Sequence, residues 1–339
     1  MPVASLATSV LTMALVSARS KLVPPARAAA GNRPRPVLIG VVGDSAAGKT
    51  TLTNGLISIF GPHRVAAMCT DDYHRYDRQE RKKLAITPLH PDCNYIEIME
   101  QHLLLLAAGQ PILKPVYGHA HGTLEAPELF EPREFVVIEG LLAYHTKAMR
   151  DCFDVKVYLD PPEDLRRKWK VQRDCSKRGY EPAEVLADLE RREPDSEAFI
   201  RPQRQHADIV VRFHPPGSSL DVDPALLSVR LVLRPTLPHP YLIDIAQRTR
   251  VDHENPIRLS LARDSGKPVD VLEVEGGLDP GVSATVEQVI WESMALDEHS
   301  LDRNAIGLFQ DGERLRRSET LAITQLLLVA QLCGATVSD

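Results

Sequence analysis

The sequence predicts an α/β protein built on a doubly wound, mostly parallel β-sheet. Short apolar runs rich in β-branched residues alternate with stretches that have a helical pattern. A glycine-rich loop joins the first run to a helix, and acidic residues follow two later runs. Strands of a parallel sheet are covered by helices on both faces and therefore read as continuous apolar runs. Their alternation with helices indicates the doubly wound arrangement.

The loop at residues 43–50 has the pattern G-x-x-x-x-G-K-[ST] of the P-loop nucleoside triphosphate hydrolases. It follows the apolar run Val37–Val42 and opens a helical stretch, Thr51–Ile57. Backbone N–H groups at such a junction converge on one point, where a phosphate binds. A glycine–lysine turn formed by chance is the alternative, and the strand and helix on either side argue against it. The candidate nucleotide-binding residues are Gly43, Asp44, Ser45, Ala46, Ala47, Gly48, Lys49, Thr50 and Thr51.

Two residues of this loop have side chains suited to a nucleotide. Lys49 would reach the β- and γ-phosphates, and the hydroxyl of Thr50 would bind Mg²⁺. The sequence therefore predicts a nucleoside triphosphate and Mg²⁺ as ligands.

Further strands and one clear helix follow along the chain. Tyr95–Ala108 predicts a helix that ends before Gly109, because Ile96, Met99, Leu103 and Leu106 share one side. The runs that predict strands are Arg64–Cys69, Phe135–Ile138, Phe153–Leu159 and Ala207–Phe213.

A composition break at Pro215–Ser219 divides the chain into a P-loop core, residues 35–215, and a C-terminal α+β extension, residues 216–339. Strands are predicted there over Leu226–Leu233 and Val269–Val274. An amphipathic helix is predicted over Arg314–Leu332. We expect this extension to continue the sheet and to supply subunit contacts.

Residues 1–34 are excluded from the predicted fold as a leader or targeting segment. The first 43 residues contain no Asp or Glu but carry five Arg or Lys residues. An organelle transit peptide, a disordered bacterial leader and a start codon assigned too early all have this composition. The opening stretch is too short and too polar to span a membrane, and no later stretch is expected to cross one.

Net charge and cysteine content limit the classes of binding partner and the redox compartment. The formal net charge of −6 argues against nucleic acid, which requires a basic face. The five cysteines are scattered, odd in number and without a C-x-x-C pair, as in a reducing compartment rather than in a disulfide framework or a zinc site.

Acidic residues stand where the predicted strands end. Asp71 and Asp72 follow one strand, and Glu139 ends another. A kinase needs one carboxylate to accept the proton of the attacking hydroxyl and another to hold Mg²⁺. The alternative for Glu139 is an ordinary cap or turn residue.

A cationic segment comes directly after Asp72. Residues 74–83 include His74, three arginines and two lysines, which suits an acceptor that itself carries a phosphate. A solvated surface loop has the same composition, and charge content alone does not separate the two.

A basic helix is predicted over Asp164–Gly179, with seven Lys or Arg against three acids from Glu163 to Arg178. Its Arg166, Lys170, Arg173 and Lys177 share one face. A helix that closes as a lid over the transferred phosphoryl group would carry such a basic face. Ordinary surface ion pairs explain it equally well.

Several segments resemble phosphoribulokinase of the plant and cyanobacterial type over residues 37–215, and more weakly beyond. Residues 69–78 resemble the family's C-x-D-D-Y-H-x-x-D-R, and residues 114–119 its K-P-[IV]-Y-x-H. The later segments are V-I-E-G-L at 137–141, K-x-Q-R-D at 170–174 with R-G at 178–179, and G-L-F-Q at 307–310.

The resemblance implies transfer of the ATP γ-phosphoryl group to the C1 hydroxyl of D-ribulose 5-phosphate. It implies that Asp71 is the base, that Asp174 is a second catalytic or metal-associated acid and that Glu139 organises Mg²⁺-ATP. The sugar phosphate would be bound by His74, Arg78, Lys82, His119, Arg173 and Arg178. A nucleoside kinase of the uridine kinase type and a non-catalytic nucleotide sensor are the alternatives.

One position departs from the family. Plant-type members carry a loop cysteine that forms a regulatory disulfide with the cysteine equivalent to Cys69, and this chain has Ala47 there. The departure favours a bacterial cytoplasm, with the plastid stroma expected only if residues 1–34 are a transit peptide. A homodimer without membrane or nucleic-acid partners is expected.

Overall fold

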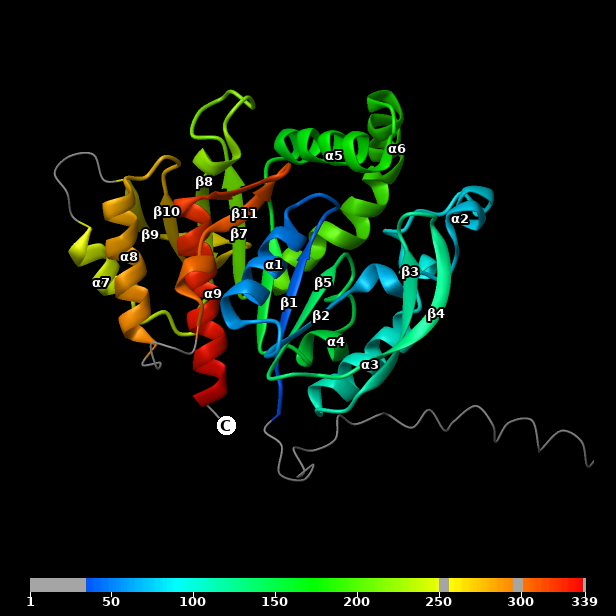
Figure 1. Ribbon diagram of the computed structural model, residues 1–339, viewed down its shortest axis with the longest axis horizontal. Helices are drawn as coiled ribbons and strands as arrows, with labels where there is room; N and C mark the ends of the chain where they lie inside the picture. Colours follow the sequence, from blue (N-terminus) through cyan, green and yellow to red (C-terminus); the bar gives the residue numbers. More distant parts are fainter. Residues whose placement is uncertain (1–34, 250–255, 295–300, 338–339) are drawn as a thin grey trace, which may run out of the picture. The chain divides into compact units, whose positions relative to one another are not determined.

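An eight-stranded sheet forms the centre of the protein, in the strand order β2-β5-β1-β6-β7-β8-β10-β9 (Figure 1). The computed structural model describes residues 35–249, 256–294 and 301–337. The predicted leader lies outside the described residues. The predicted doubly wound, mostly parallel sheet is confirmed.

Five neighbouring strands are parallel, so their carboxyl ends meet at one edge of the sheet. The phosphate loop follows β1 at this edge. The strands are β1 (Val37–Gly43), β2 (Val65–Cys69), β5 (Phe135–Gly140), β6 (Val155–Leu159) and β7 (Ile209–His214).

Alternate residues of β1 enter two different cores. Ile39 and Val41 pack with α1 (Lys49–Phe60) on one face, whereas Leu38 and Val42 pack with α3 (Ile96–Ala107) on the other. The short helix α4 (Lys147–Asp151) also contributes to the second face through its buried Met149. Both faces of the strand are therefore apolar, as its unbroken hydrophobic sequence predicts.

The C-terminal part continues the same sheet with antiparallel strands, whereas the predicted core strands are parallel. β8 (Ser228–Leu233) pairs antiparallel with β7, and β10 (Lys267–Val274) lies between β8 and β9 (Ile257–Asp264). The change of direction follows from the connection before β8, which contains only a 3₁₀ turn and lacks the crossover helix that a parallel neighbour requires. The helices that follow are α7 (Leu242–Arg248), α8 (Pro280–Ser293) and α9 (Glu319–Val337).

The prediction for the last helix was partly wrong. Residues Arg314–Arg317 form β12, which pairs with β11 (Leu308–Asp311), and α9 begins only at Glu319. α9 is also not amphipathic, because the side chains from Thr320 to Val329 are all buried. A helix that is buried on all sides in this way lies inside a core.

Helix α9 is long and apolar enough to cross a membrane by length and composition, contrary to the expectation that no such stretch exists. However, 72 % of its Glu319–Thr336 stretch is buried within the protein. It packs against α1 and α8 and belongs to the core on the α1 face of the sheet.

The remaining elements surround the edge of the sheet where the parallel strands end. α5 (Glu163–Arg178) and α6 (Pro182–Asp195) follow β6 and lie beyond the phosphate loop (Figure 1). α2 (Arg78–Leu84) follows β2, and the antiparallel pair β3 (Ile112–Gly118) and β4 (Thr123–Phe130) stands beside it.

Candidate active site

The phosphate loop has the turn that its sequence predicts. Ala46 and Gly48 both have left-handed backbone angles, with φ of 65° and 96°. Glycine adopts this conformation freely, whereas Ala46 does so at a cost of about 1 kcal/mol. The Lys49 ammonium donates to the carbonyl oxygens of Gly43 (2.9 Å) and Asp44 (2.8 Å), so the loop curls around the lysine.

Glu139 lies beside the start of α1 and accepts two hydrogen bonds from it. Thr50 Oγ1 donates to Glu139 Oε1 and Thr53 Oγ1 donates to Oε2, both at 2.9 Å. The β-sheet register places Glu139 opposite Val41 on one side and Cys69 on the other. The carboxylate predicted to organise the metal thus touches the hydroxyl predicted to bind it.

These oxygens fit Mg²⁺, which prefers hard ligands and keeps several waters and phosphate oxygens of its own. Two protein oxygens, from Thr50 and Glu139, are therefore a suitable set. The described residues contain no group of three or more His, Cys, Asp or Glu side chains arranged around a metal position.

Asp71 is half-buried just after β2 and lies near basic side chains, two of them histidines. Burial acts to raise the pKa of its carboxyl, but His74, His119, Lys49 and Arg173 outweigh it and hold this pKa below its usual range. The carboxylate is therefore ionised at neutral pH, the form that accepts a proton.

Its neighbour Asp72 has a different environment. Asp72 accepts from the buried Lys114 ammonium at 2.7 Å and from the backbone N–H of Tyr117 at 3.0 Å. Both partners lie on β3, so Asp72 ties the segment after β2 to this strand. Of the two adjacent acids, only Asp72 has such side-chain hydrogen bonds to other described residues.

Three rings form a row on the acceptor side of Asp71. His74 meets Tyr117 edge to face at 4.9 Å, and Tyr117 meets His119 in the same way at 5.2 Å. Arg81 lies over the Tyr117 ring at 4.9 Å and donates to its hydroxyl. The cationic segment is therefore packed against β3 rather than solvated along its whole length.

Arg78 and Lys82 differ in their surroundings. Arg78 Nη2 donates to the His119 carbonyl oxygen at 2.7 Å, which places it at the β3–β4 turn. Lys82 is exposed on α2, and its side chain makes no hydrogen bond or ion pair with another described residue. The structure thus brings His74, Arg78 and His119 together, with Lys82 at the outside.

The basic helix α5 packs on the phosphate loop. Arg166 is buried and donates to the Ser45 carbonyl oxygen at 3.0 Å, and Arg173 Nη2 reaches Ser45 Oγ at 3.5 Å. Ordinary surface ion pairs, the alternative that the residue spacing left open, do not account for these contacts with the phosphate loop. The side chain of Lys177 lies outside the described part of the chain.

Asp174 is buried within α5 and is held by three cations of the same helix. Lys170 Nζ lies 2.5 Å from Asp174 Oδ2, and Arg173 Nε lies 2.9 Å from Oδ1, with Arg178 at 3.5 Å. Burial opposes ionisation, but the bonds from Arg173 and Lys170 lower the pKa of Asp174. Arg178 thus contacts Asp174 on the same helix. Among the described residues, no contact joins Arg178 to the row of rings formed by His74, Tyr117 and His119.

Two residues that the sequence did not single out contribute to the site. Ser196 donates to Asp44 Oδ2, and together with Arg166, 3.6 Å from Oδ1, it ties the lid region to the phosphate loop. Asn94 bonds to His74 Nδ1 at 2.8 Å. Ser196 and Asn94 are far in sequence from their partners, so no local pattern marks them.

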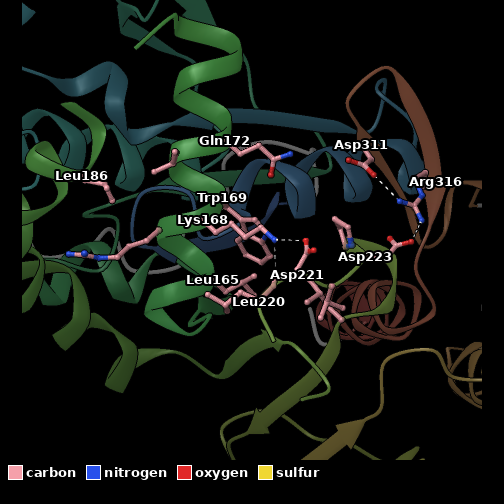
Figure 2. A pocket seen from close by; sticks show the side chains of 15 residues that line it. Leu165, Lys168, Trp169, Gln172, Leu186, Leu220, Asp221, Asp223, Asp311 and Arg316 are labelled. Carbon is pink, nitrogen blue, oxygen red and sulfur yellow. Dashed lines mark hydrogen bonds and ion pairs between the residues drawn. The ribbon is translucent and has the colours of Figure 1, made fainter. Parts of the chain in front are cut away.

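A large cavity of about 870 Å³ lies on another side of α5 (Figure 2). Trp169 and Gln172 line it from the helix, and ion pairs of Lys168 with Asp221 (3.4 Å) and of Arg316 with Asp223 (2.6 Å) flank it. None of the predicted site residues lines this cavity. The candidate active site is therefore the region around Asp71 and the phosphate loop.

The chain is similar in sequence to known kinases. A phosphoribulokinase from Synechocystis sp. is 43 % identical over 198 residues, which are 58 % of this chain and 60 % of that protein. The chain thus spans less than two thirds of that relative. A uridine kinase from Lactiplantibacillus plantarum is 31 % identical over 202 residues, which are 58 % of this chain and 95 % of that protein.

The phosphoribulokinase from Rhodobacter spheroides has a similar fold, with a TM-score of 0.53 and 19 % sequence identity over 76 % of this chain and 99 % of that one. The family model named "Phosphoribulokinase / Uridine kinase family" matches residues 38–217, more than half of the chain. The chain therefore belongs to the phosphoribulokinase/uridine kinase family, a family of P-loop kinases.

Proposed function

We propose that this protein transfers the γ-phosphoryl group of ATP to the C1 hydroxyl of D-ribulose 5-phosphate, giving ribulose 1,5-bisphosphate and ADP. One observation carries the proposal: Asp71 lies among cationic side chains from α1, α5 and the β3–β4 turn. A base in such surroundings suits an acceptor that brings its own phosphate. The 43 % identity to a phosphoribulokinase supports the same substrate.

The nucleotide would be held by the phosphate loop. Its backbone N–H groups and Lys49 would bind the β- and γ-phosphates, and Thr50 with Glu139 would hold Mg²⁺. Bound Mg²⁺ neutralises charge on the phosphate oxygens. Arg173, which reaches Ser45 of this loop, would add a positive charge beside the phosphoryl group during transfer.

Asp71 would act as the general base. The C1 oxygen forms a bond to the γ-phosphorus while the bond from that phosphorus to the ADP oxygen breaks, and the hydroxyl proton passes to the Asp71 carboxylate. Asp174 would act through the cations it holds, Lys170 and Arg173. The sugar phosphate would lie among His74, Arg78, His119 and Arg173, with Lys82 and Arg178 at the margin.

A nucleoside kinase of the uridine kinase type is the second candidate, since a uridine kinase is 31 % identical over nearly its whole length. An uncharged nucleoside would leave the cations around Asp71 without a partner. A non-catalytic nucleotide sensor is the third candidate, and it gives no role to Asp71 as a base.

Measuring ADP release with ribulose 5-phosphate and with uridine as acceptors separates these candidates. We expect turnover with ribulose 5-phosphate and little with uridine. Preference for uridine would exclude the proposal, and tight Mg²⁺-ATP binding without turnover on either acceptor would support the sensor.

The proposed setting is a bacterial cytoplasm, in line with the similarity to a cyanobacterial protein. We also propose a homodimer. Edge strand β9 pairs with β10 on one side, and its Leu261 is 84 % exposed, which suits association with another copy. Light scattering coupled to size exclusion measures the oligomeric state.

A further inference from the structure

Asn94 is held so firmly that the orientation of its amide is determined. It is 3 % exposed, and its Nδ2 donates to the carbonyl oxygens of Pro88 at 3.1 Å and His90 at 2.9 Å. Turning the amide over would place its oxygen against two carbonyl oxygens and leave its N–H groups without these partners. The Oδ1 atom of Asn94 therefore faces His74.

This contact determines which ring nitrogen of His74 carries hydrogen. Asn94 Oδ1 lies 2.8 Å from His74 Nδ1, and an amide oxygen can only accept. Nδ1 is therefore the donor. The backbone keeps the pair in place, because residues 74 and 94 form an antiparallel bridge and Tyr95 N donates to the Tyr73 carbonyl oxygen at 2.8 Å.

The other ring nitrogen, Nε2, has no hydrogen-bond partner among the described residues, and His74 is 3 % exposed. Burial lowers the pKa of His74, as do the charges of Arg81 and His119, and they outweigh Asp71 and the bond to Asn94, which act to raise it. A neutral ring that donates through Nδ1 has a lone pair on Nε2.

On the proposed sugar-phosphate kinase function, we infer that Asn94 is a positioning residue that makes His74 Nε2 an acceptor for a hydroxyl group of the sugar. A phosphate oxygen has no hydrogen to offer this lone pair, whereas a hydroxyl does. In ribulose 5-phosphate the carbon next to C1 carries a carbonyl oxygen, which can only accept, so this hydroxyl is the one at C3 or C4. The phosphate is left to cations that always donate, such as Arg78 and Arg173.

This assignment refines the expectation that His74 binds the phosphate, because it divides the acceptor site into two parts. A site that hydrogen-bonds a particular hydroxyl rejects analogues lacking it far better than an apolar wall does. His74 would therefore select for the hydroxylated sugar, and Asn94 would control this selectivity without touching the substrate.

The first test is the tautomer of His74, which needs no substrate. In the full-length protein labelled with ¹⁵N-histidine, long-range ¹H–¹⁵N spectra at pH 7.5 should show a protonated Nδ1 and an unprotonated Nε2. The Asn94→Leu variant should lose this preference. A protonated Nε2 in the wild-type protein would overturn the inference whatever the enzyme phosphorylates.

The second test uses side chains that replace one ring nitrogen at a time. Gln reaches the position of Nε2, and Asn reaches only that of Nδ1. His74→Gln should keep KM for ribulose 5-phosphate within about tenfold of wild type, and His74→Asn should raise it by roughly 10²-fold or more, with KM for ATP unchanged in both. Equal losses in the two variants would contradict the role of Nε2.

Inorganic phosphate, as a competitive inhibitor against the sugar phosphate, tests the division of the site. Its inhibition constant should be unchanged in His74→Gln and raised in Arg78→Met. An equal rise in both would place the phosphate on His74 and overturn the inference. His90→Gln is the matched control, because His90 contacts Asn94 only through its backbone.

If ribulose 5-phosphate is not phosphorylated at all, the proposed function fails while the tautomer result still stands. If it is phosphorylated and Asn94→Leu has wild-type KM values, the function stands and the positioning role fails.

Discussion

Asp71 owes its ionisation to neighbours from four separate segments of the chain. Burial alone would raise the pKa of this carboxyl, and Lys49, His74, His119 and Arg173 reverse the effect. At the scale of single residues, the groups that keep Asp71 ionised are therefore brought together only in the folded protein.

Replacing Asp71 by Asn tests its role as base. The substitution keeps the shape and removes the proton acceptor, so turnover should fall by at least about 10²-fold while Mg²⁺-ATP binding is retained. Calorimetry with a non-hydrolysable ATP analogue and a coupled ADP assay measure the two quantities. Asp72→Asn is not a suitable control because Asp72 holds Lys114. Unchanged turnover in Asp71→Asn would remove Asp71 from the mechanism.

Arg173 and Arg178 provide a matched pair on one helix, since both contact Asp174 but only Arg173 reaches Ser45. Arg173→Ala should lower kcat/KM for the sugar phosphate by about 10–10³-fold, and Arg178→Ala by less than tenfold. Steady-state kinetics with each substrate varied in turn separates the effects. A change confined to KM for ATP would assign Arg173 to the nucleotide alone.

At the scale of elements, α5 carries an internal charge cluster against the phosphate loop. Burial lowers the pKa of Lys170 to about 8, with Arg192 and Arg173 adding to the effect, although the bond to Asp174 opposes it. The lid helix therefore contains a lysine that titrates close to physiological pH.

This pKa gives a prediction with a definite sign. Folding lowers the pKa of Lys170, so the folded state binds its proton less tightly than the unfolded state. The free-energy cost of burying the charged Lys170 ammonium is therefore fully present below about pH 8. It decreases as the pH rises toward 10.5, the pKa of this lysine in the unfolded state. The stability of wild type relative to Lys170→Met should therefore increase from pH 7 to 9.5, by roughly 1–3 kcal/mol.

Urea denaturation at the two pH values measures this difference. Lys168→Met, on another side of the same helix, is the control and should show little pH dependence relative to wild type. A relative stability that falls with pH would contradict the assigned environment of Lys170.

A second element-scale prediction concerns the contact between α1 and α9. A methyl group at Gly55 would overlap the buried Gln325 side chain, whose Oε1 accepts from Gly307 N at 2.7 Å. Gly55→Ala should therefore destabilise the protein by about 1–3 kcal/mol, although alanine favours helices. Gly334→Ala in α9 meets no atom within 4 Å and should be neutral or stabilising. Thermal denaturation of both variants compares them, and equal melting temperatures would contradict the contact.

Local sequence patterns correctly predicted the elements whose glycine motif or apolar periodicity is visible in the sequence. The phosphate loop, α3 and the apolar strands were located correctly because their periodicity reflects burial on known faces. The β3–β4 pair was not predicted, since its Leu113 and Leu129 face solvent and leave no alternation of exposed polar and buried apolar residues. Residues 314–317 were assigned to a helix although their pairing with β11 makes them a strand.

The same limit applies to the site. Asp71 and Glu139 were placed near the phosphate loop because parallel strands end at one edge of the sheet. Asn94 and Ser196 were missed because both lie far in sequence from their partners. A backbone bridge brings Asn94 to His74, and Ser196 reaches Asp44 from the start of the π-helical segment Ser196–Ile200. The roles of the site residues remain predictions until they are measured.

At the scale of the whole molecule, one hydrophobic core joins both parts of the chain. β8 pairs with β7, and Leu326 of α9 lies in the same core as Leu56 of α1. The predicted division near residue 215 therefore marks a change in sequence composition, but the hydrophobic core is continuous across it.

A fragment of residues 35–217 should accordingly fail to fold on its own. It would expose the α1 side of the sheet and leave β7 as an unpaired edge, a state prone to aggregation. Circular dichroism during heating, together with light scattering, tests the fragment against the full chain. A cooperative unfolding transition at the temperature of the full chain would show that the core does not depend on the C-terminal part.

The packing of α9 behind α1 has a consequence for how this protein diverges from its relatives. The family match ends at residue 217, well before α9, yet α9 supports the helix that carries Lys49 and Thr50. Substitutions in a weakly matched segment can therefore change the affinity for the nucleotide while every residue that touches it stays the same. Differences in kinetics between members of the family need not lie in their motifs.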